Sequence, residues 1–307
     1  MIATREAYGK TLAELAKKDS RIVALDADVA KSTGILPVLQ QAPAQYISCG
    51  IAEQNMVCMG SGLATCGMIP FVTTFAVFTS MRAVEQVRNG VCYPNLNVKV
   101  CGTHAGLETG ADGATHQAIE DIAIMRSLPN MRVLIPASPL AAEKMTRLAA
   151  YTDGPIYLRM GKDPAPEVYT PEADFRLGGS NRLTEGGDVT VIACGNMVPR
   201  ALEAAEILKN EGISARVIDL YSIKPLDEES IIAAAKETKG ILTIEDHVLT
   251  GGLGGAVCEV LCEHAPTRVI RMGLNNCFGR SGAPADLYER FGLTPQKIAE
   301  NAKALCK

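Results

Sequence analysis

The chain alternates short apolar runs with amphipathic segments of helical period along almost its whole length, and this alternation limits the folds that it can adopt. In the first half, the apolar runs fall at 21–25, 97–101, 132–135 and 156–158. Segments 4–18 and 117–128 carry a helical pattern, and Ser138-Pro139 supplies an N-cap and a first-turn proline for a further helix. This alternation predicts a mostly parallel sheet with helices on both faces.

The alternation stops in the middle of the chain and then restarts. Residues 163–187 are rich in proline and contain the pairs Gly178-Gly179 and Gly186-Gly187, a composition typical of a linker. Predicted strands at 188–193, 215–220, 241–245 and 268–272 follow, separated by predicted helices at 198–210, 227–238 and 253–263. We therefore expect an α/β protein with two doubly wound domains, residues 1–162 and 188–307, joined by the linker 163–187.

A segment without any charged residue, from Gln54 to Met81, is long enough to cross a bilayer. It also contains three glycines, a proline and six Ser or Thr residues, which favour a water-soluble fold. We expect a buried helix, a turn at Gly67, and a buried strand that leads into another helix. Coverage by the sheet or by a partner chain would account for the missing charge.

Composition excludes several classes of function. Lys and Arg number 30 and Asp and Glu number 34, so the net charge of −4 lacks the basic patch expected for nucleic acid or anionic membranes. Charged residues throughout 5–18 argue against a secretory signal peptide. The ten cysteines form no Cys-x-x-Cys pair, as expected for reduced thiols in a cytoplasmic protein.

Two clusters carry residues suited to chemistry. Glu53 follows Gly50 and opens the uncharged segment, so its carboxylate either complements a helix dipole or meets a ligand. Residues 102–121 (GTHAGLETGADGATHQAIED) combine four glycines with His104, Asp112 and His116. Two histidines and an Asp in one glycine-rich loop predict a loop that approaches a ligand closely.

Two further motifs in the second half have simpler interpretations. Gly251–Gly255 (GGLGG) lies at a predicted helix start but lacks the spacing of a dinucleotide-binding loop, and we interpret it as a packing turn. Glu245-Asp246-His247 is interpreted as a loop at the end of a strand.

The sequence resembles a known family at three motifs in order. GIAEQNM (50–56), PFVTTFAVF (70–78) and GADGATHQAIED (110–121) are similar to the pyrimidine-binding domain of transketolases. IEDHVLTGGLGGAV (244–257) is similar to their C-terminal domain, so the resemblance covers essentially the whole chain.

The resemblance implies roles for particular residues. Glu53 matches the glutamate that hydrogen-bonds the aminopyrimidine ring of thiamine diphosphate and promotes its imino tautomer. Phe75 and Phe78 match aromatic residues around that ring. Met81 stands where many transketolases have another aromatic residue. His104, Asp112 and His116 match groups that bind the sugar hydroxyls and assist proton transfer. The resemblance makes His104 and His116 catalytic residues. Phosphate contacts are matched by Arg159, Arg5 and Ser32.

The resemblance also implies a partner. Transketolases hold Mg²⁺ and the diphosphate through a GDG motif and a following asparagine in an N-terminal domain, and this sequence contains no GDG. We therefore expect the C-terminal subunit of a split transketolase, inactive without a separate N-terminal subunit and assembled as α2β2. Such an enzyme transfers a two-carbon ketol unit between sugar phosphates, as in the pentose phosphate pathway.

Three alternatives remain open. The β subunit of a 2-oxo acid dehydrogenase shares the fold and the Glu53 position, although His104 and Thr115–Gln117 favour sugar chemistry. Half of a deoxyxylulose-phosphate synthase-like enzyme would also carry GADGATHQ. A non-catalytic regulatory subunit is the third alternative, and the retained Glu53, His104, Asp112, His116 and Arg159 argue against it.

Overall fold

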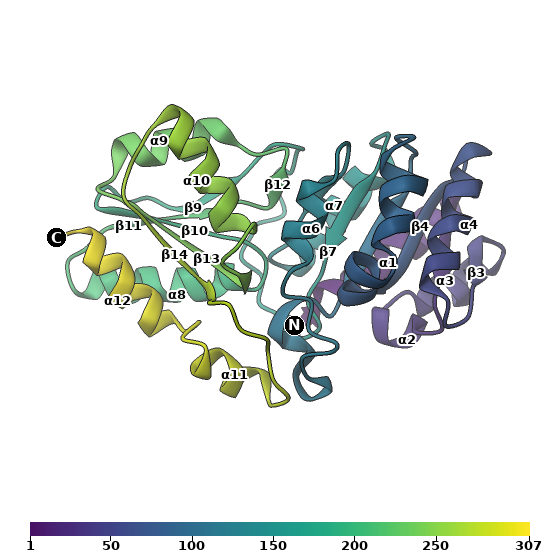
Figure 1. The fold of residues 1–307 in the computed structure, drawn as a ribbon, viewed down its shortest axis with the longest axis horizontal. Helices are drawn as coiled ribbons and strands as arrows, with labels where there is room; N and C mark the ends of the chain where they lie inside the picture. The colour runs from purple at the N-terminus through teal and green to yellow at the C-terminus, as the bar shows by residue number, and fades with distance from the viewer.

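A computed structural model describes all residues from 1 to 307, in which two twisted sheets lie side by side (Figure 1). The first sheet has the order β12-β6-β7-β5-β4-β2-β3 and the second β14-β13-β10-β11-β9. Every pair of neighbouring strands is parallel except those made by the edge strands β12 and β9. The expected α/β fold with mostly parallel sheets is thus confirmed.

The first sheet contains β2 (Ile22–Asp26), β3 (Tyr46–Ser48), β4 (Ile69–Phe75), β5 (Lys99–Thr103), β6 (Arg132–Leu134), β7 (Ile156–Arg159) and β12 (Ser222–Lys224). One face packs on α1 (Thr4–Lys18), α3 (Leu36–Gln41) and α7 (Pro139–Ala150), and the other on α4 (Glu53–Thr65) and α6 (Asp121–Ser127). Successive side chains of β2 point to opposite faces of the sheet. Ile22 and Ala24 lie in one apolar core, and Val23 and Leu25 lie in the other. This two-sided burial explains why the strands are continuous apolar runs.

The uncharged segment has the predicted order of helix, turn and strand, but the helix is not buried as expected, since only four of its residues are: Glu53, Met56, Val57 and Gly60. It forms α4, turns at Gly67 with a φ of +81°, and returns as β4. Beyond β4 the chain becomes helical with two π turns, Phe78–Arg82 and Val87–Cys92, on either side of α5 (Val84–Gln86). No helix is both long and apolar enough to traverse a bilayer.

The second sheet contains β9 (Asn181–Thr184), β10 (Val189–Ala193), β11 (Ala215–Asp219), β13 (Ile241–Val248) and β14 (Val269–Leu274). Helices α8 (Met197–Asn210) and α12 (Pro295–Leu305) cover one face, and α9 (Glu228–Glu237) and α10 (Leu253–His264) cover the other (Figure 1). The short helix α11 (Pro284–Arg290) packs against the loop that follows β5.

The two halves of the chain are interlocked. Strand β12 comes from the second half but pairs antiparallel with β6 at the edge of the first sheet. One apolar core runs without interruption from the α4 and α6 side of the first sheet to the α9 and α10 side of the second. Loops between the sheets therefore have fixed positions relative to both.

Several sequence predictions need correction. The segment 163–187 contains two short strands, β8 (Pro164–Ala165), paired with β1 (Ile2–Ala3), and β9, so it is partly structured. Helix α6 begins at Asp121, four residues later than expected at 117, because residues 117–120 still belong to the glycine-rich loop. Glu245-Asp246-His247 lies inside β13 and is wholly buried, since this strand runs on to Val248.

Candidate active site

Most of the predicted site residues gather at the carboxyl edge of the first sheet. Phe75 is the last residue of β4, His104 immediately follows β5, and Glu53 is the first residue of α4. Because the parallel strands β4 and β5 are neighbours, their ends bring Phe75 and His104 together. The carboxyl edge of a parallel sheet is where α/β proteins commonly bind ligands.

Four aromatic rings pack together at this edge. The rings of Phe75 and Phe78 are stacked with centroids 5.7 Å apart, and His104 stacks on Phe75 at 4.1 Å. His116 meets Phe78 edge-on at 5.5 Å and Phe75 at 6.4 Å. The structure therefore joins both predicted histidines to both predicted phenylalanines. Met81, like both phenylalanines, packs against a small apolar cluster made of Ala76, Val77, Ala105 and Ala118.

His104 is held in an unusual conformation. Its backbone has a φ of +57°, which few residues other than glycine adopt, and its ring is buried. Its Nδ1 lies 3.0 Å from the Thr103 hydroxyl, and its carbonyl accepts a hydrogen bond of 2.7 Å from Thr109. Burial, followed by the nearby charges of Arg5, Lys162 and His116, lowers the pKa of His104 to about 3. The ring is therefore neutral at ordinary pH.

Glu53 is linked to the aromatic cluster by Arg82. The Glu53 carboxylate is only 4% exposed and accepts a hydrogen bond of 2.7 Å from the guanidinium of Arg82. The same guanidinium lies 4.0 Å above the Phe78 ring, in cation–π contact. Sequence reasoning missed Arg82, because nothing in a linear pattern indicates that residue 82 returns to residue 53.

The cationic groups beside His104 are Arg5 and Lys162. Arg5 donates to the Lys162 carbonyl at 3.0 Å and to the Ser32 carbonyl at 2.5 Å, so the structure brings the two predicted phosphate contacts Arg5 and Ser32 together. Lys162 donates to the Thr109 carbonyl at 2.9 Å. Lys162 was also missed, although its place three residues after Arg159, just past the end of β7, was a usable signal.

Two glycines allow Arg5 to reach Ser32. A Cβ at Gly9 would lie 1.8 Å from the Gly34 carbonyl oxygen, and a Cβ at Gly34 would lie 2.4 Å from the Arg5 carbonyl oxygen. Helix α1 can therefore press directly on the turn that follows Ser32.

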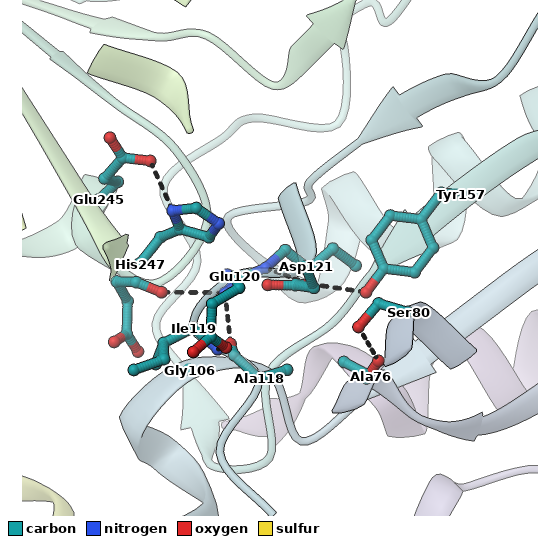
Figure 2. Close-up of polar contacts among 12 residues, drawn as sticks. Ala76, Ser80, Gly106, Ala118, Ile119, Glu120, Asp121, Tyr157, Glu245 and His247 are labelled. Atoms are coloured by element: carbon teal, nitrogen blue, oxygen red, sulfur yellow. Dashed lines mark hydrogen bonds and ion pairs between the residues drawn. The ribbon is translucent and has the colours of Figure 1, made fainter. Parts of the chain in front are cut away.

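The structure places Arg159, the predicted phosphate contact, in a buried network of protein partners. Its guanidinium is buried and donates to Asp121 at 2.8 Å and to the carbonyls of Ala118 and Asp246 at 3.2 and 2.9 Å. Asp121 also accepts a bond of 2.7 Å from the Tyr157 hydroxyl, and the two face each other in Figure 2. These partners occupy Nε and Nη2 of the guanidinium, which leaves only Nη1 for any further ligand.

Asp112 lies at the end of a 3₁₀ segment, Gly106–Asp112, and its side chain is exposed. No protein hydrogen bond ends on its carboxylate, which leaves both oxygens available to a ligand. Ser281 from the second half donates to the adjacent Ala111 carbonyl at 2.5 Å and fixes this part of the loop.

Asp246 anchors the glycine-rich loop to the second half of the chain. Its carboxylate accepts two bonds of 3.1 and 3.0 Å from the Leu107 amide, one of 2.7 Å from Tyr288 and one of 3.0 Å from Asn196. A Cβ at Gly106 would lie 2.1 Å from this carboxylate, so only glycine fits there.

The neighbours of Asp246 are structural as well. Glu245 accepts from the amides of Leu253 and Gly254 at 2.6 and 2.8 Å and so caps α10; this explains the GGLGG turn, because a Cβ at Gly252 would lie 2.0 Å from Glu245 Oε2. His247 lies 3.6 Å from Glu245 (Figure 2), and the Ala123 amide donates to its Nε2 at 3.3 Å. The predicted packing turn is confirmed.

The residues present fit one half of thiamine diphosphate. A buried carboxylate beside two aromatic faces suits a flat heterocycle with hydrogen-bonding nitrogens. For the metal ion that accompanies the diphosphate half, the structure shows no group of three or more His, Cys, Asp or Glu side chains that could hold it.

Comparisons with known proteins show the family of the chain. The family models described as "Transketolase, pyrimidine binding domain" and "Transketolase, C-terminal domain" match residues 1–167 and 178–298. A "Putative transketolase C-terminal section" of Methanocaldococcus jannaschii is 45% identical and covers 96% of this chain and 94% of its own length.

Two named relatives act on different sugars. The "6-deoxy-6-sulfo-D-fructose transketolase subunit SqwH" of Clostridium sp. is 40% identical over 97% of this chain and 92% of its own length. One of the subunits of an apulose-4-phosphate transketolase of Phocaeicola vulgatus is 38% identical over 100% and 98%. A solved structure, "Split gene transketolase, inactive beta4 tetramer", superimposes with a TM-score of 0.93 at 46% identity, covering 100% of this chain and 99% of that one.

The low pKa of His104 can be tested by NMR. We expect the imidazole signals of His104 to report the neutral ring down to about pH 4. Since the folded pKa lies below the ordinary value of 6.5, the unfolded state alone binds this proton as the pH falls from 6.5. Acidification should therefore destabilise the wild type more than His104→Asn, by up to about 1.4 kcal/mol per pH unit. A ring that titrates near pH 6.5 would contradict this account.

The structural role of Arg159 can be tested by denaturation. Arg159→Met leaves the buried Asp121 carboxylate without its counter-ion, so urea unfolding should show a loss of about 3–5 kcal/mol. Adding Asp121→Asn should recover part of the loss, and Lys162→Met should cost less than about 1 kcal/mol. An Arg159→Met protein of wild-type stability that binds sugar phosphates poorly would restore the phosphate role.

Proposed function

The chain belongs to the transketolase family, and we propose that it is the C-terminal subunit of a two-subunit, thiamine diphosphate-dependent transketolase. In this proposal the enzyme transfers a two-carbon ketol unit from a ketose phosphate to an aldose phosphate. The observation that carries it is the single cluster formed by Glu53, Phe75, Phe78, His104 and His116 at the carboxyl edge of the first sheet. This cluster has groups suited to the reacting half of the cofactor.

Thiamine diphosphate, when bound, supplies the electron sink that lets a carbon–carbon bond beside a ketone break. The task of Glu53 in this proposal is to hold a proton at a ring nitrogen of the aminopyrimidine. Its burial excludes water from that contact and strengthens it. The stacked Phe75 and Phe78 rings orient the heterocycle against Glu53.

The two histidines and Asp112 face the sugar in this proposal. A neutral His104 can donate one hydrogen bond and accept another, which suits a sugar hydroxyl that loses or gains a proton. His116 is half-buried at the mouth of the cluster, where it can exchange a proton with substrate and solvent. The exposed Asp112 carboxylate accepts a hydroxyl hydrogen bond.

Arg5 and Lys162, with Ser32 beside Arg5, are proposed to bind the anionic end of the sugar in place of Arg159. Lys162 donates to the Thr109 carbonyl, the Thr109 hydroxyl donates to the His104 carbonyl, and Arg5 donates to the Lys162 carbonyl, so hydrogen bonds connect both cations to the loop that carries His104. The names of two relatives specify anionic sugars, one a sulfonate and one a phosphate. The physiological sugar of this chain is therefore proposed only as a class, a ketose with a terminal anion.

The proposal includes a partner chain. Relatives that match along almost their entire length are named as a section or a subunit, which supports a separate N-terminal subunit here. That subunit would hold Mg²⁺ and the diphosphate, and pairing of two such units would give α2β2. The structural neighbour described as an inactive β4 tetramer supports self-association and inactivity of the unpartnered chain.

Reconstitution tests the proposed function. We expect no ketol transfer from this chain alone, and activity after mixing with its N-terminal subunit, Mg²⁺ and thiamine diphosphate. Glu53→Gln should lower kcat at least about 100-fold, since a positioned proton-transfer group contributes that much or more, while sedimentation shows unchanged assembly. Glu85→Gln, an exposed change on the neighbouring helical segment, is the control. Activity of the isolated chain, or a Glu53→Gln enzyme with most of its rate, would contradict the proposal.

The role of Arg5 and Lys162 predicts a selective kinetic defect. Lys162→Met should raise KM for a phosphorylated ketose about 10-fold or more, the usual effect of losing a charged hydrogen bond, and change KM for the dephosphorylated sugar little. Lys17→Met, an exposed cation on α1, is the matched control. Equal defects on both sugars would show that Lys162 does not contact the phosphate.

A further inference from the structure

The guanidinium of Arg82 makes two contacts, and both are with groups that the proposed function reserves for the cofactor. It donates to Glu53 at 2.7 Å and lies 4.0 Å above the Phe78 ring. No other hydrogen bond or ion pair of the structure involves the Arg82 side chain. The nearest acid on its own segment, Glu85, is occupied by Gln86 and Asn89 at 2.6 and 2.5 Å.

These two contacts have the chemistry of an aminopyrimidine ring. A guanidinium is flat, presents N–H donors along its edge and stacks on aromatic faces. An aminopyrimidine is also flat, meets a carboxyl group through its edge nitrogens and stacks through its face. One planar group therefore already occupies the hydrogen-bonding edge of Glu53 and a face of Phe78.

We propose that Arg82 is a placeholder for the aminopyrimidine ring, occupying Glu53 and Phe78 in the cofactor-free chain and leaving them when the cofactor binds. This inference rests on the proposed function, and it assigns a role to a residue that neither the motif nor the proposed chemistry includes.

Burial of Glu53 explains why a placeholder is useful. A carboxylate that is 4% exposed, with no counter-ion, would be strongly destabilised or would turn away toward solvent. Arg82 compensates the charge and holds the carboxylate in the direction from which the ring would approach. The site is thus kept in its binding geometry before the cofactor arrives.

The position of Arg82 explains how it can leave. Its side chain is 47% exposed, so the guanidinium can swing into solvent without breaking other contacts. Arg82 is the last residue of the first π turn, and α5 separates it from the second. The helical backbone is therefore irregular on both sides of α5. A half-exposed ion pair and a single cation–π contact are each weak enough for a bound ring to replace.

Calorimetric titration of thiamine diphosphate into the assembly with the N-terminal subunit and Mg²⁺ tests this role. Arg82→Gln removes the competitor, so Kd should fall about 3- to 10-fold, the combined strength of the two displaced contacts. Arg82→Lys keeps the charge but not the flat stacking group and should lie between wild type and Arg82→Gln. Arg88→Gln, an exposed arginine on the same segment, should bind as the wild type does.

A double-mutant cycle isolates the competition for Glu53. In a Glu53→Gln background, Arg82→Gln should tighten binding less than it does when Glu53 is present. Unchanged or weaker cofactor binding by Arg82→Gln, in a variant whose thermal unfolding matches the wild type, would overturn the placeholder role alone. If the wild-type assembly fails to bind thiamine diphosphate, both this role and the proposed function are overturned.

Discussion

The candidate site depends on a buried ion pair beneath it, between Arg159 and Asp121. Charges are costly to bury, and further hydrogen bonds to both members help to offset that cost, although Asp121 Oδ1 has no partner. Arg159 also bonds the carbonyls of Ala118 and Asp246, and Asp121 also accepts from Tyr157. These bonds join β7, the start of α6, the end of the glycine-rich loop and a strand of the second sheet. The loop that carries both site histidines is therefore fixed at its base by residues from both halves of the chain.

Above this base the site residues range from buried to exposed. His104 is neutral and buried, whereas His116 is half-buried and Asp112 is exposed. Glu53 is buried too, but its one counter-ion reaches it from a half-exposed arginine. Tight packing beneath the site and available polar groups at its rim are what a binding surface requires when a second chain completes it. The second half of the chain supports this site by anchoring the loop through Asp246.

Local signals in the sequence predict much of this structure. Residues 4–18 form α1 with the predicted boundaries, and the Ser138 hydroxyl caps α7 by accepting from the Ala141 amide, because periodicity and capping act over a few residues. The meeting of Phe75 with His104 follows from the pairing of β4 with β5. The family resemblance implied that both residues belong to the site.

The contacts that the sequence does not reveal join distant residues. Arg159 occupies a motif position that implied phosphate binding, but its partner Asp121 lies on a helix whose approach no linear pattern reveals. Arg82 reaches back 29 residues to Glu53, and β12 crosses to the other sheet. Long flexible side chains and edge strands find partners through the assembled fold, so their roles emerge only from three-dimensional structure.

A structure of this chain assembled with its N-terminal subunit, Mg²⁺ and thiamine diphosphate would test the account most directly. It should place an aminopyrimidine nitrogen within hydrogen-bonding distance of the Glu53 carboxyl group, with the ring against Phe78 and the Arg82 guanidinium turned toward solvent. A cofactor bound away from Glu53, or an interface between the chains that excludes the aromatic cluster, would contradict it.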